Sequence, residues 1–505
     1  MKYIDYVQLN PFQKFGFKFV EFFRLLPKRI KDFFCFIGRS IKNFFVGIGR
    51  FIAEYFMGFI HGDIFTKLSY IFMGAGNIAK GQVVKGIAFF ILEALYIAFM
   101  VFFGGGAIVN LIGLVAVYDR IPIAGPGNRF NDVLVFNSTQ NLLFGILAIM
   151  ATIAFIAIYF VSIKSALNCE RIKRNGGKPM NFRQESSELL NSRFHTTLLS
   201  LPIILISVFV LLPLIFMIAM AFTNFGMGAG TIESFKWVGL RNFENIFSMS
   251  ADGGASMGET FLRVAGWTLV WAVFATFSNY ILGMVVALMI NKKGIKLKKL
   301  WRTLFVMTIA VPQFVTLLLM SQMLKPDSES AFNIIASWLG AAEPINLWSS
   351  ANDGLLARIT VIVVNCWVGI PYTILMTSGI LMNIPEDLYE SARIDGAGPV
   401  KSFVKITLPY MLFVTTPYLI TTFIGNVNNF NVIFLLSQGN PKVNEYKYGA
   451  GKTDLMITLL YKLSIDQNKY GLGAAIGILV FIICATLSLV TFNMTKSAKN
   501  EEEFS

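Results

Sequence analysis

The sequence predicts an all-α polytopic membrane protein with about eight transmembrane helices. Of its 505 residues, 55% are hydrophobic and only 14% are charged, which is more apolar surface than a soluble domain can bury. Runs of about 20 apolar residues recur along the chain, and that length crosses a bilayer. The basic residues behind the net charge of +14 flank these runs. They therefore indicate membrane topology and contact with anionic lipid rather than with nucleic acid.

The candidate spans follow from apolar length. Because their number is even, both chain termini are expected on the same side of the membrane. The eight spans are residues 87–103, 141–163, 197–222, 264–290, 301–323, 356–382, 410–436 and 470–494.

The distribution of Lys and Arg predicts the orientation. The side that holds both termini and the loop at 385–409 carries 31 of these residues, and the other side carries 12. Cytoplasmic loops hold the excess of positive charge, so both termini and this loop are expected in the cytoplasm. The outer loop 437–469 departs from the rule, because it contains five lysines.

The chain is expected to divide into four parts. Residues 1–86 alternate Phe-rich clusters with Lys and Arg, which favours interfacial or cytoplasmic helices, with a poorly ordered basic tail as the alternative. Residues 87–195 hold two additional transmembrane helices and a cytoplasmic loop. Residues 196–496 form a transmembrane core, and 497–505 form a cytoplasmic tail.

Little in the sequence suggests catalysis. The two histidines have no acid or cysteine cluster at metal-ligand spacing, and the four cysteines are scattered, so neither a metal site nor a disulfide framework is expected. The string Gly449-Ala-Gly-Lys-Thr453 imitates the end of a phosphate-binding loop, but Tyr446 stands where the first glycine is required. The chain is therefore expected to be no enzyme and to hold no cofactor, with any ATP bound by a partner.

Glu93 lies inside the first predicted span. An ionisable group within a membrane is a functional candidate, but no second acid, His or Arg accompanies it along the span. We expect a structural hydrogen bond rather than an ion relay.

The segment Glu386–Pro409 is a polar island between two apolar spans. Pro385 and Glu386 begin a predicted helix with acids in its first turn. Gly396 and Gly398 allow backbone conformations closed to other residues. A second helix begins at Pro399, and its apolar face is formed by Val400, Phe403, Val404 and Ile406. From the residues alone, this helix-turn-helix could equally be an ordinary amphipathic connection.

The same segment resembles the EAA motif (EAA-x3-G-x9-I-x-L-P) of the permease subunits of bacterial ABC importers. The motif positions match at the required spacing, with Ser391 in place of the middle alanine as the only departure. The resemblance implies a coupling helix that docks in a cleft of a cytosolic ATPase subunit. The residues it assigns to coupling are Glu390, Ser391, Ala392, Asp395, Gly396, Ala397, Ile406, Leu408 and Pro409.

Over residues 197–494, the chain is similar to the MalF-type permease of maltose and maltodextrin importers, and residues 67–86 are similar to the N-terminal extension of the Gram-positive form. This resemblance implies a location in the bacterial plasma membrane. It also implies three partners: a second permease resembling MalG, a homodimeric ATPase resembling MalK that uses ATP and Mg, and an extracellular lipid-anchored sugar-binding protein.

The resemblance further implies a sugar cavity between the two helices that flank the EAA loop. Asn365, Gly369 and Tyr372 share a helical face, and Thr422, Asn426 and Asn429 repeat the same spacing. Amides and a tyrosine ring suit sugar hydroxyls and sugar faces. Alternatively, these amides hydrogen-bond neighbouring helices. The implied lining residues are Asn365, Val368, Gly369, Tyr372, Thr422, Gly425, Asn426 and Asn429.

Together these features predict the permease subunit of an ATP-driven importer that translocates an oligosaccharide, with a maltodextrin-like sugar expected. Gly425 stands where the maltose permease has an aromatic residue, so the choice of sugar stays open. The alternatives are an ABC permease for a different sugar or solute, an ion-coupled secondary transporter, and a membrane enzyme or scaffold.

Overall fold

The computed structural model describes residues 55–114, 119–124, 130–135, 138–226, 235–249, 255–292 and 294–494, with single positions between 35 and 53. Most of the basic N-terminal segment and the tail 497–505 lie outside the described residues. The chain forms two compact units, each described by itself below: unit 1 is Met1–Ile108 with Leu147–Phe209, and unit 2 is Val109–Ile146 with Val210–Ser505.

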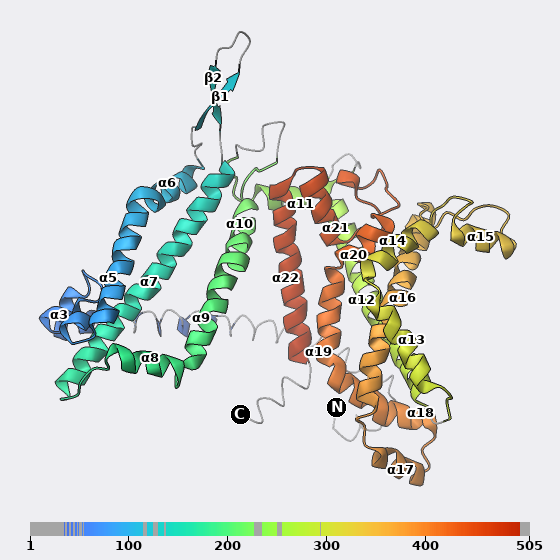
Figure 1. Ribbon diagram of the computed structural model, residues 1–505. Coiled ribbons are helices and arrows are strands. Elements are labelled where there is room, and N and C mark those ends of the chain that lie inside the picture. The colour runs from blue at the N-terminus through green and yellow to red at the C-terminus, as the bar shows by residue number, and fades with distance from the viewer. Residues whose placement is uncertain are drawn as a thin grey trace. The chain divides into compact units, whose positions relative to one another are not determined.

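Nearly all the described residues are helical (Figure 1). A short antiparallel hairpin, β1 (Asp119–Ala124) with β2 (Phe130–Val135), is the addition to the predicted helical fold. Unit 1 contains α3 (Ile64–Leu68), α4 (Ala75–Ala79), α5 (Val83–Phe99), α8 (Phe182–Leu190) and α9 (Phe194–Ile206). Helices α6 (Gly105–Gly113) and α7 (Ser138–Arg174) divide between the units. Unit 2 contains α10 (Leu212–Met220), α11 (Arg241–Phe247), α12 (Met257–Asn291), α13 (Lys298–Ala310), α14 (Gln313–Met323), α15 (Ala331–Trp338), α16 (Leu355–Leu381), α17 (Glu386–Ile394), α18 (Pro399–Ser402), α19 (Leu408–Val427), α20 (Phe430–Val432), α21 (Met456–Tyr461) and α22 (Tyr470–Met494).

The predicted spans are recovered, most of them with longer bounds, while the last candidate span, Tyr470–Leu489, is shorter. Among the described residues, seven helices are long and apolar enough to cross a membrane, and α13 with α14 makes an eighth if this pair, bent by 87°, is one span. The bend falls at Val311-Pro312, where proline interrupts the helical hydrogen bonds. The seventh predicted span begins earlier, at Pro399, and ends at Val427.

Unit 1 is built on close glycine contacts. Gly74 has a φ of +84°, and a Cβ placed there would lie 2.2 Å from the carbonyl oxygen of Gly86. The backbone before α4 therefore lies directly on the first turn of α5. Farther along α5, the Tyr96 ring stacks on Phe155 of α7, with ring centroids 3.8 Å apart.

Glu93 makes the hydrogen bond expected of it. It lies buried on α5, and its Oε2 accepts a hydrogen bond from the backbone N–H of Met73 at 2.7 Å. A buried backbone N–H needs a partner, so this carboxylate closes the turn that precedes α4. Glu93 therefore has a structural role, and the observation that had suggested an ion relay is explained by this hydrogen bond.

Unit 2 is organised by the 35-residue helix α12, which packs along α16 and α19. Small residues bring α12 and α16 together: a Cβ on Gly283 would lie 2.6 Å from the Thr373 side chain. On the other side, the Tyr280 hydroxyl lies 2.8 Å from Thr415 Oγ1 of α19. Close backbone approach and interhelical hydrogen bonds replace the hydrophobic drive that is missing in lipid.

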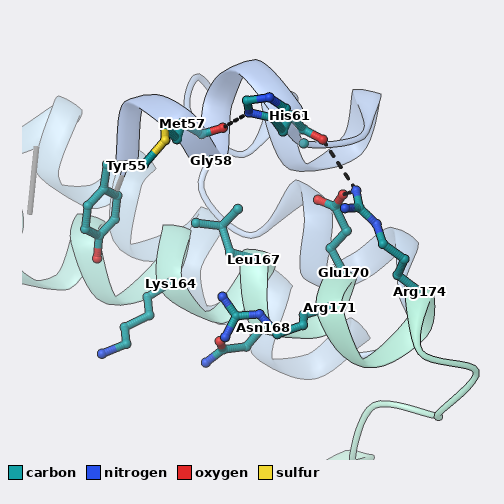
Figure 2. Close-up of a pocket in the computed structure, with 11 residues that line it drawn as sticks. Tyr55, Met57, Gly58, His61, Lys164, Leu167, Asn168, Glu170, Arg171 and Arg174 are labelled. Carbon is teal, nitrogen blue, oxygen red and sulfur yellow. Dashed lines mark hydrogen bonds and ion pairs between the residues drawn. The ribbon is translucent and has the colours of Figure 1, made fainter. Parts of the chain in front are cut away.

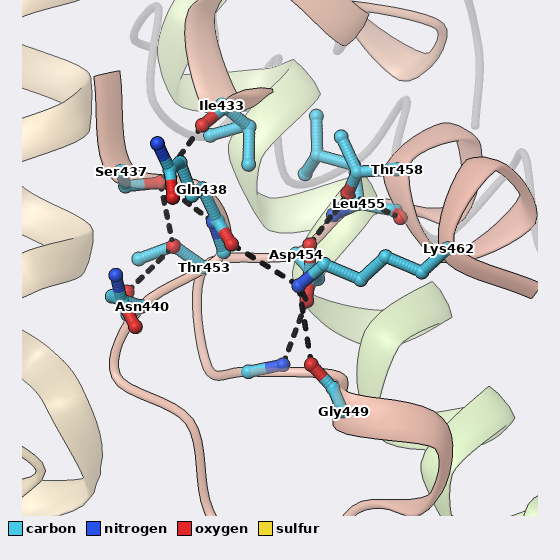
Figure 3. A network of polar contacts seen from close by, with 12 residues as sticks. Ile433, Ser437, Gln438, Asn440, Gly449, Thr453, Asp454, Leu455, Thr458 and Lys462 are labelled. Atoms are coloured by element: carbon cyan, nitrogen blue, oxygen red, sulfur yellow. Dashed lines mark hydrogen bonds and ion pairs between the residues drawn. The ribbon is translucent and has the colours of Figure 1, made fainter. Parts of the chain in front are cut away.

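Residues 430–466, predicted as the end of a span and an outer loop, fold into a packed cap. Its centre is Asp454, which is fully buried and accepts from Lys462 Nζ at 2.6 Å (Figure 3). Asp454 also accepts from the Gly451 N–H and the Thr458 hydroxyl, and Lys462 donates to the carbonyls of Gln438 and Gly449. Burial raises the pKa of the Asp454 carboxyl, while Lys462 favours its charged form. One ion pair therefore joins the turn at Gln438, the turn at 449–451 and the helix that begins at Met456.

This cap accounts for two of the five lysines in the outer loop 437–469, whose number is unexpected for a loop outside the membrane. Lys452 is buried and pairs with Asp353 at 2.5 Å and with Glu445 at 3.2 Å. Burial acts to lower the pKa of Lys452, but hydrogen bonds to these two carboxylates raise it above its ordinary value. Lys452 and Lys462 are therefore counter-ions within the fold and do not report topology.

Replacing Lys462 by Met should destabilise the cap strongly, because it leaves the Asp454 charge buried without its partner. Breaking a buried pair from one side costs about 3–5 kcal/mol. The apparent melting temperature of the detergent-solubilised chain measures the effect.

The control is Arg263→Gln, which removes exposed pairs with Glu259 and Glu445 worth about 0–1 kcal/mol each. The double change Asp454→Leu with Lys462→Met should recover part of the loss, since no charge is then left unpaired. Equal melting shifts for Lys462→Met and Arg263→Gln would contradict the central role of the pair.

Candidate functional site

The EAA-like segment forms two short helices joined by a turn that depends on Gly396. The N–H of Gly396 donates to the carbonyl of Arg393, and the N–H of Ala397 donates to that of Ala392. Together with a φ of +72° at Gly396, these bonds form a Schellman motif at the end of α17. A side chain at this left-handed position is strained. Gly398 has a φ of −70°, so only the first of the two predicted glycines is required for its conformation.

The second helix of the segment continues into a membrane span. Pro399 occupies the first turn of α18, where its missing N–H costs nothing. A π-helical turn, Phe403–Thr407, then leads without a break into α19. The Tyr389 hydroxyl of α17 lies 2.8 Å from Thr407 Oγ1 and holds α17 to this π-helical turn.

The assigned coupling residues lie at or near the surface of this segment. Among the described residues, Glu390, Ser391, Asp395, Gly396 and Pro409 are exposed, and Ala392, Ala397, Ile406 and Leu408 are half-buried. Apolar side chains surround them without cover from this chain: Ile394 is 87% exposed and Val400 is 76% exposed. Of the predicted apolar face, Phe403 packs against the cluster around Met411. The segment thus presents a mixed polar and apolar surface.

The predicted sugar face on α16 is only partly committed to packing. Asn365 is buried, and its Nδ2 has no hydrogen-bond partner among the described residues. Val368 packs against a buried cluster that includes Trp271. Tyr372 is 56% exposed, so its ring is available at the surface of the single chain. This face therefore holds a buried, unpaired amide donor and, two helical turns further along, an exposed aromatic ring.

The predicted face on α19 is more engaged with the protein itself, and it does not extend to Asn429, because α19 ends at Val427 and Asn429 is the N-cap of α20. Asn426 Nδ2 donates to Thr276 Oγ1 of α12 at 2.9 Å, and Asn426 Oδ1 accepts from Asn429 at 3.2 Å. Asn429 also caps α20 through the N–H of Val432. Both amides therefore serve helix contacts, as the alternative interpretation of the sequence stated. Thr422 is half-buried, and Gly425 is exposed, so that a Cβ placed on it would meet no atom within 4 Å.

The structure brings the two faces together through aromatic rings. Tyr372 of α16 and Tyr418 of α19 stack with centroids 6.2 Å apart. Tyr418 stands four residues before Thr422 and so extends the predicted α19 face by one turn. Sequence reasoning missed Tyr418, although its spacing was visible. The eight predicted residues and Tyr418 are all uncharged, which suits a neutral polar ligand.

Asn279 of α12 is a second residue that sequence reasoning missed. Its Oδ1 is buried without a hydrogen-bond partner among the described residues, and its side chain lies against Gly369, where a Cβ would stand 2.5 Å from Asn279 Nδ2. Polar atoms left unpaired within a membrane are costly. A lone Asn within an otherwise apolar span was the signal available in the sequence.

Comparison with known proteins places the chain among transport components. Residues 279–497 match the family described as "Binding-protein-dependent transport system inner membrane component". The chain is 32% identical to the galactooligosaccharides transport system permease protein GanP of Bacillus subtilis, over 87% of this chain and 99% of that protein. It is also 32% identical to the maltodextrin transport system permease protein MdxF of Bacillus subtilis, over 86% of this chain and 95% of that protein. Among solved structures, a bacterial ABC transporter for alginate import aligns with 62% of this chain and 98% of its own, at 21% identity and a TM-score of 0.48.

Gly369→Ala should disturb the contact between α12 and α16, because the new methyl group would collide with Asn279. Overpacking of this kind costs about 1–3 kcal/mol, and the apparent melting temperature in detergent should fall. Gly425→Ala is the matched control, since its methyl group meets open space. An unchanged melting temperature for Gly369→Ala would show that the two helices are not in such close contact.

Proposed function

The chain belongs to the family of binding-protein-dependent transport system inner membrane components, and on that premise we propose how it couples sugar passage to ATP. It is a multi-pass membrane permease subunit of an ABC sugar importer of the maltodextrin type. The substrate we propose is an oligosaccharide. GanP and MdxF carry names that specify galactooligosaccharides and maltodextrin respectively, so the linkage of the sugar is left to experiment.

The proposed topology places both termini and the Glu386–Pro409 segment in the cytoplasm. The excess of Lys and Arg on that side supports this orientation. The excess becomes larger when Lys452 and Lys462, which are buried, are left out of the number counted for the outer loops. Importers of this class work with a second permease, an ATPase and a binding protein. The partners proposed here are a MalG-like permease, a MalK-like homodimeric ATPase that uses ATP and Mg, and a lipid-anchored sugar-binding protein. In this arrangement the permease chain itself holds no cofactor.

The observation that carries the mechanism is continuity of the chain. Helix α16 ends at Leu381, five residues before α17, and the α18 helix continues into α19. The two helices with the proposed sugar face are thus the two that the EAA-like segment connects. A displacement of this segment by an ATPase partner would be passed to α19 through the continuous helix and to α16 through the short link 382–385. We propose that ATPase closure opens the cavity outward and that hydrolysis resets it.

The proposed sugar contacts divide into ring surface and hydrogen-bonding groups. Tyr372 and Tyr418 provide aromatic faces on which a pyranose ring can stack. Asn365 Nδ2 and Asn279 Oδ1 supply one unpaired donor and one unpaired acceptor. Asn426 supports the face by fixing α19 against α12, Asn429 donates to Asn426, and a ligand would compete with these internal hydrogen bonds. The exposed Gly425 leaves room beside them.

Gly396→Asp should abolish sugar uptake and sugar-stimulated ATPase activity while the chain still inserts in the membrane. The change places a β-carbon at a φ of +72° and adds charge to the docking surface. Uptake of labelled oligosaccharide by intact cells, with immunoblotting of membranes, measures both properties. Gly398→Ala is the control, because its φ of −70° suits any residue. Uptake at the unmodified rate in Gly396→Asp would refute the coupling assignment.

Tyr372→Ala should reduce oligosaccharide uptake by about tenfold. One lost stacking contact costs roughly 1.4 kcal/mol of binding free energy, which corresponds to that factor. The control is Trp367→Ala, which removes an aromatic ring that is 67% exposed on another side of the same helix. Both variants should retain ATPase assembly, measured by co-purification. Equal uptake by Tyr372→Ala and the unmodified permease for every sugar tested would move the sugar site elsewhere.

A further inference from the structure

Unit 1 contains a pocket of about 410 Å³ that the transport mechanism does not use. It lies between the helical segment 55–62 and the last third of α7 (Figure 2). Its walls combine basic, aromatic and aliphatic side chains. The residues that matter for its chemistry are Tyr55, His61, Lys164, Leu167, Asn168 and Arg171.

The pocket has a fixed floor. Gly58 approaches α7 so closely that a Cβ there would lie 2.9 Å from Leu167 Cδ1, and Figure 2 shows Leu167 pointing toward this glycine. The Tyr55 hydroxyl donates to the carbonyl of Phe160 at 3.0 Å, and the Tyr70 hydroxyl donates to the carbonyl of Tyr55 at 2.7 Å. The contacts of Gly58 and of the Tyr55 hydroxyl tie segment 55–62 to α7, and the Tyr70 bond holds it to the turn after α3, before any ligand binds.

The charges around the pocket leave a positive surplus. Glu170 is neutralised by Arg174 at 2.7 Å and lies 3.7 Å from Lys80. Lys164 and Arg171, by contrast, pair with no carboxylate within the described part of the chain. Their spacing of seven residues, with Asn168 between them, places all three on one face of α7. Two cations and an amide therefore line the same side of the pocket, where an anion would bind.

The surroundings of the pocket are apolar. Segment 55–65 exposes large hydrophobic side chains, and α7 is itself one of the candidate membrane spans. A soluble anion would leave this apolar surface uncovered, whereas a lipid would cover it with its acyl chains. The exposed residues are Phe56, Met57, Phe59, Ile60, Ile64 and Phe65.

We propose that this pocket binds the headgroup of an anionic phospholipid, with the phosphate between Lys164 and Arg171 and the acyl chains along the apolar side chains of segment 55–65. Basic pockets beside membrane helices on the cytoplasmic side recognise such headgroups. The lipid would fasten segment 55–62 to α7 and so anchor the N-terminal part of unit 1 in the inner leaflet. This role is separate from sugar passage and does not depend on the proposed sugar face.

The test uses the full-length chain in nanodiscs or detergent, with phosphatidylglycerol, phosphatidylcholine and inorganic phosphate as probes. Native mass spectrometry measures retained lipid. Lys164→Gln with Arg171→Gln should lower phosphatidylglycerol retention by about tenfold or more, since each basic residue near a membrane surface contributes on the order of 1 kcal/mol. Asn168→Trp, which fills the pocket without removing charge, should also lower retention.

The matched control is Lys173→Gln with Lys178→Gln, which removes two exposed basic residues outside the pocket. This variant should retain phosphatidylglycerol as the unmodified chain does, and an unchanged melting temperature verifies folding in all variants. Equal losses in the pocket and control variants would indicate unspecific attraction and overturn the site. Binding of inorganic phosphate with equal retention of both lipids would overturn the lipid assignment in favour of a soluble anion.

Discussion

The close contact between α12 and α16 is the constraint on which unit 2 depends. It is made possible by Gly283 and Gly369, where a methyl group would collide with the opposite helix. In lipid, helices gain little from burying apolar surface against each other, so close packing of small residues has to stabilise them. This contact fixes α16, and the Tyr280 and Asn426 bonds then fix α19 against the same helix. The EAA-like segment connects two helices that share one support.

The cap at residues 430–466 lies at the end of unit 2 away from the EAA-like segment (Figure 1) and is stabilised in a different way, by an ion pair. It covers the ends of several helices with turns, and turns leave backbone groups unpaired unless side chains satisfy them. Lys462 donates to two such carbonyls and pairs with Asp454, which itself accepts from a backbone N–H. Charge is used here to join turns. The buried Lys452 and Lys462 thus have carboxylate partners within the fold.

The amides of the proposed sugar face show that one residue type serves two purposes. Asn426 donates a hydrogen bond to Thr276 and accepts one from Asn429. Asn429 also accepts from the N–H of Val432 at the start of α20. Asn365 and Asn279 keep buried atoms without partners among the described residues. The first pair rigidifies the wall, and the second pair leaves hydrogen-bonding capacity for a ligand. Helical spacing cannot separate these purposes, because the partners come from another helix.

The sequence by itself determined the helical membrane fold, the approximate spans and the EAA-like segment, because apolar length and motif spacing are local properties. It also identified Gly396 and the structural bond of Glu93. Only the tertiary structure decided that Gly398 is dispensable for the turn, that Lys452 and Lys462 are counter-ions, and that Asn279 and Tyr418 join the predicted face. The φ of Gly398 is a local property that its sequence position did not reveal, whereas the other facts depend on residues that different turns and helices bring together. Their contacts exist only after the helices have packed.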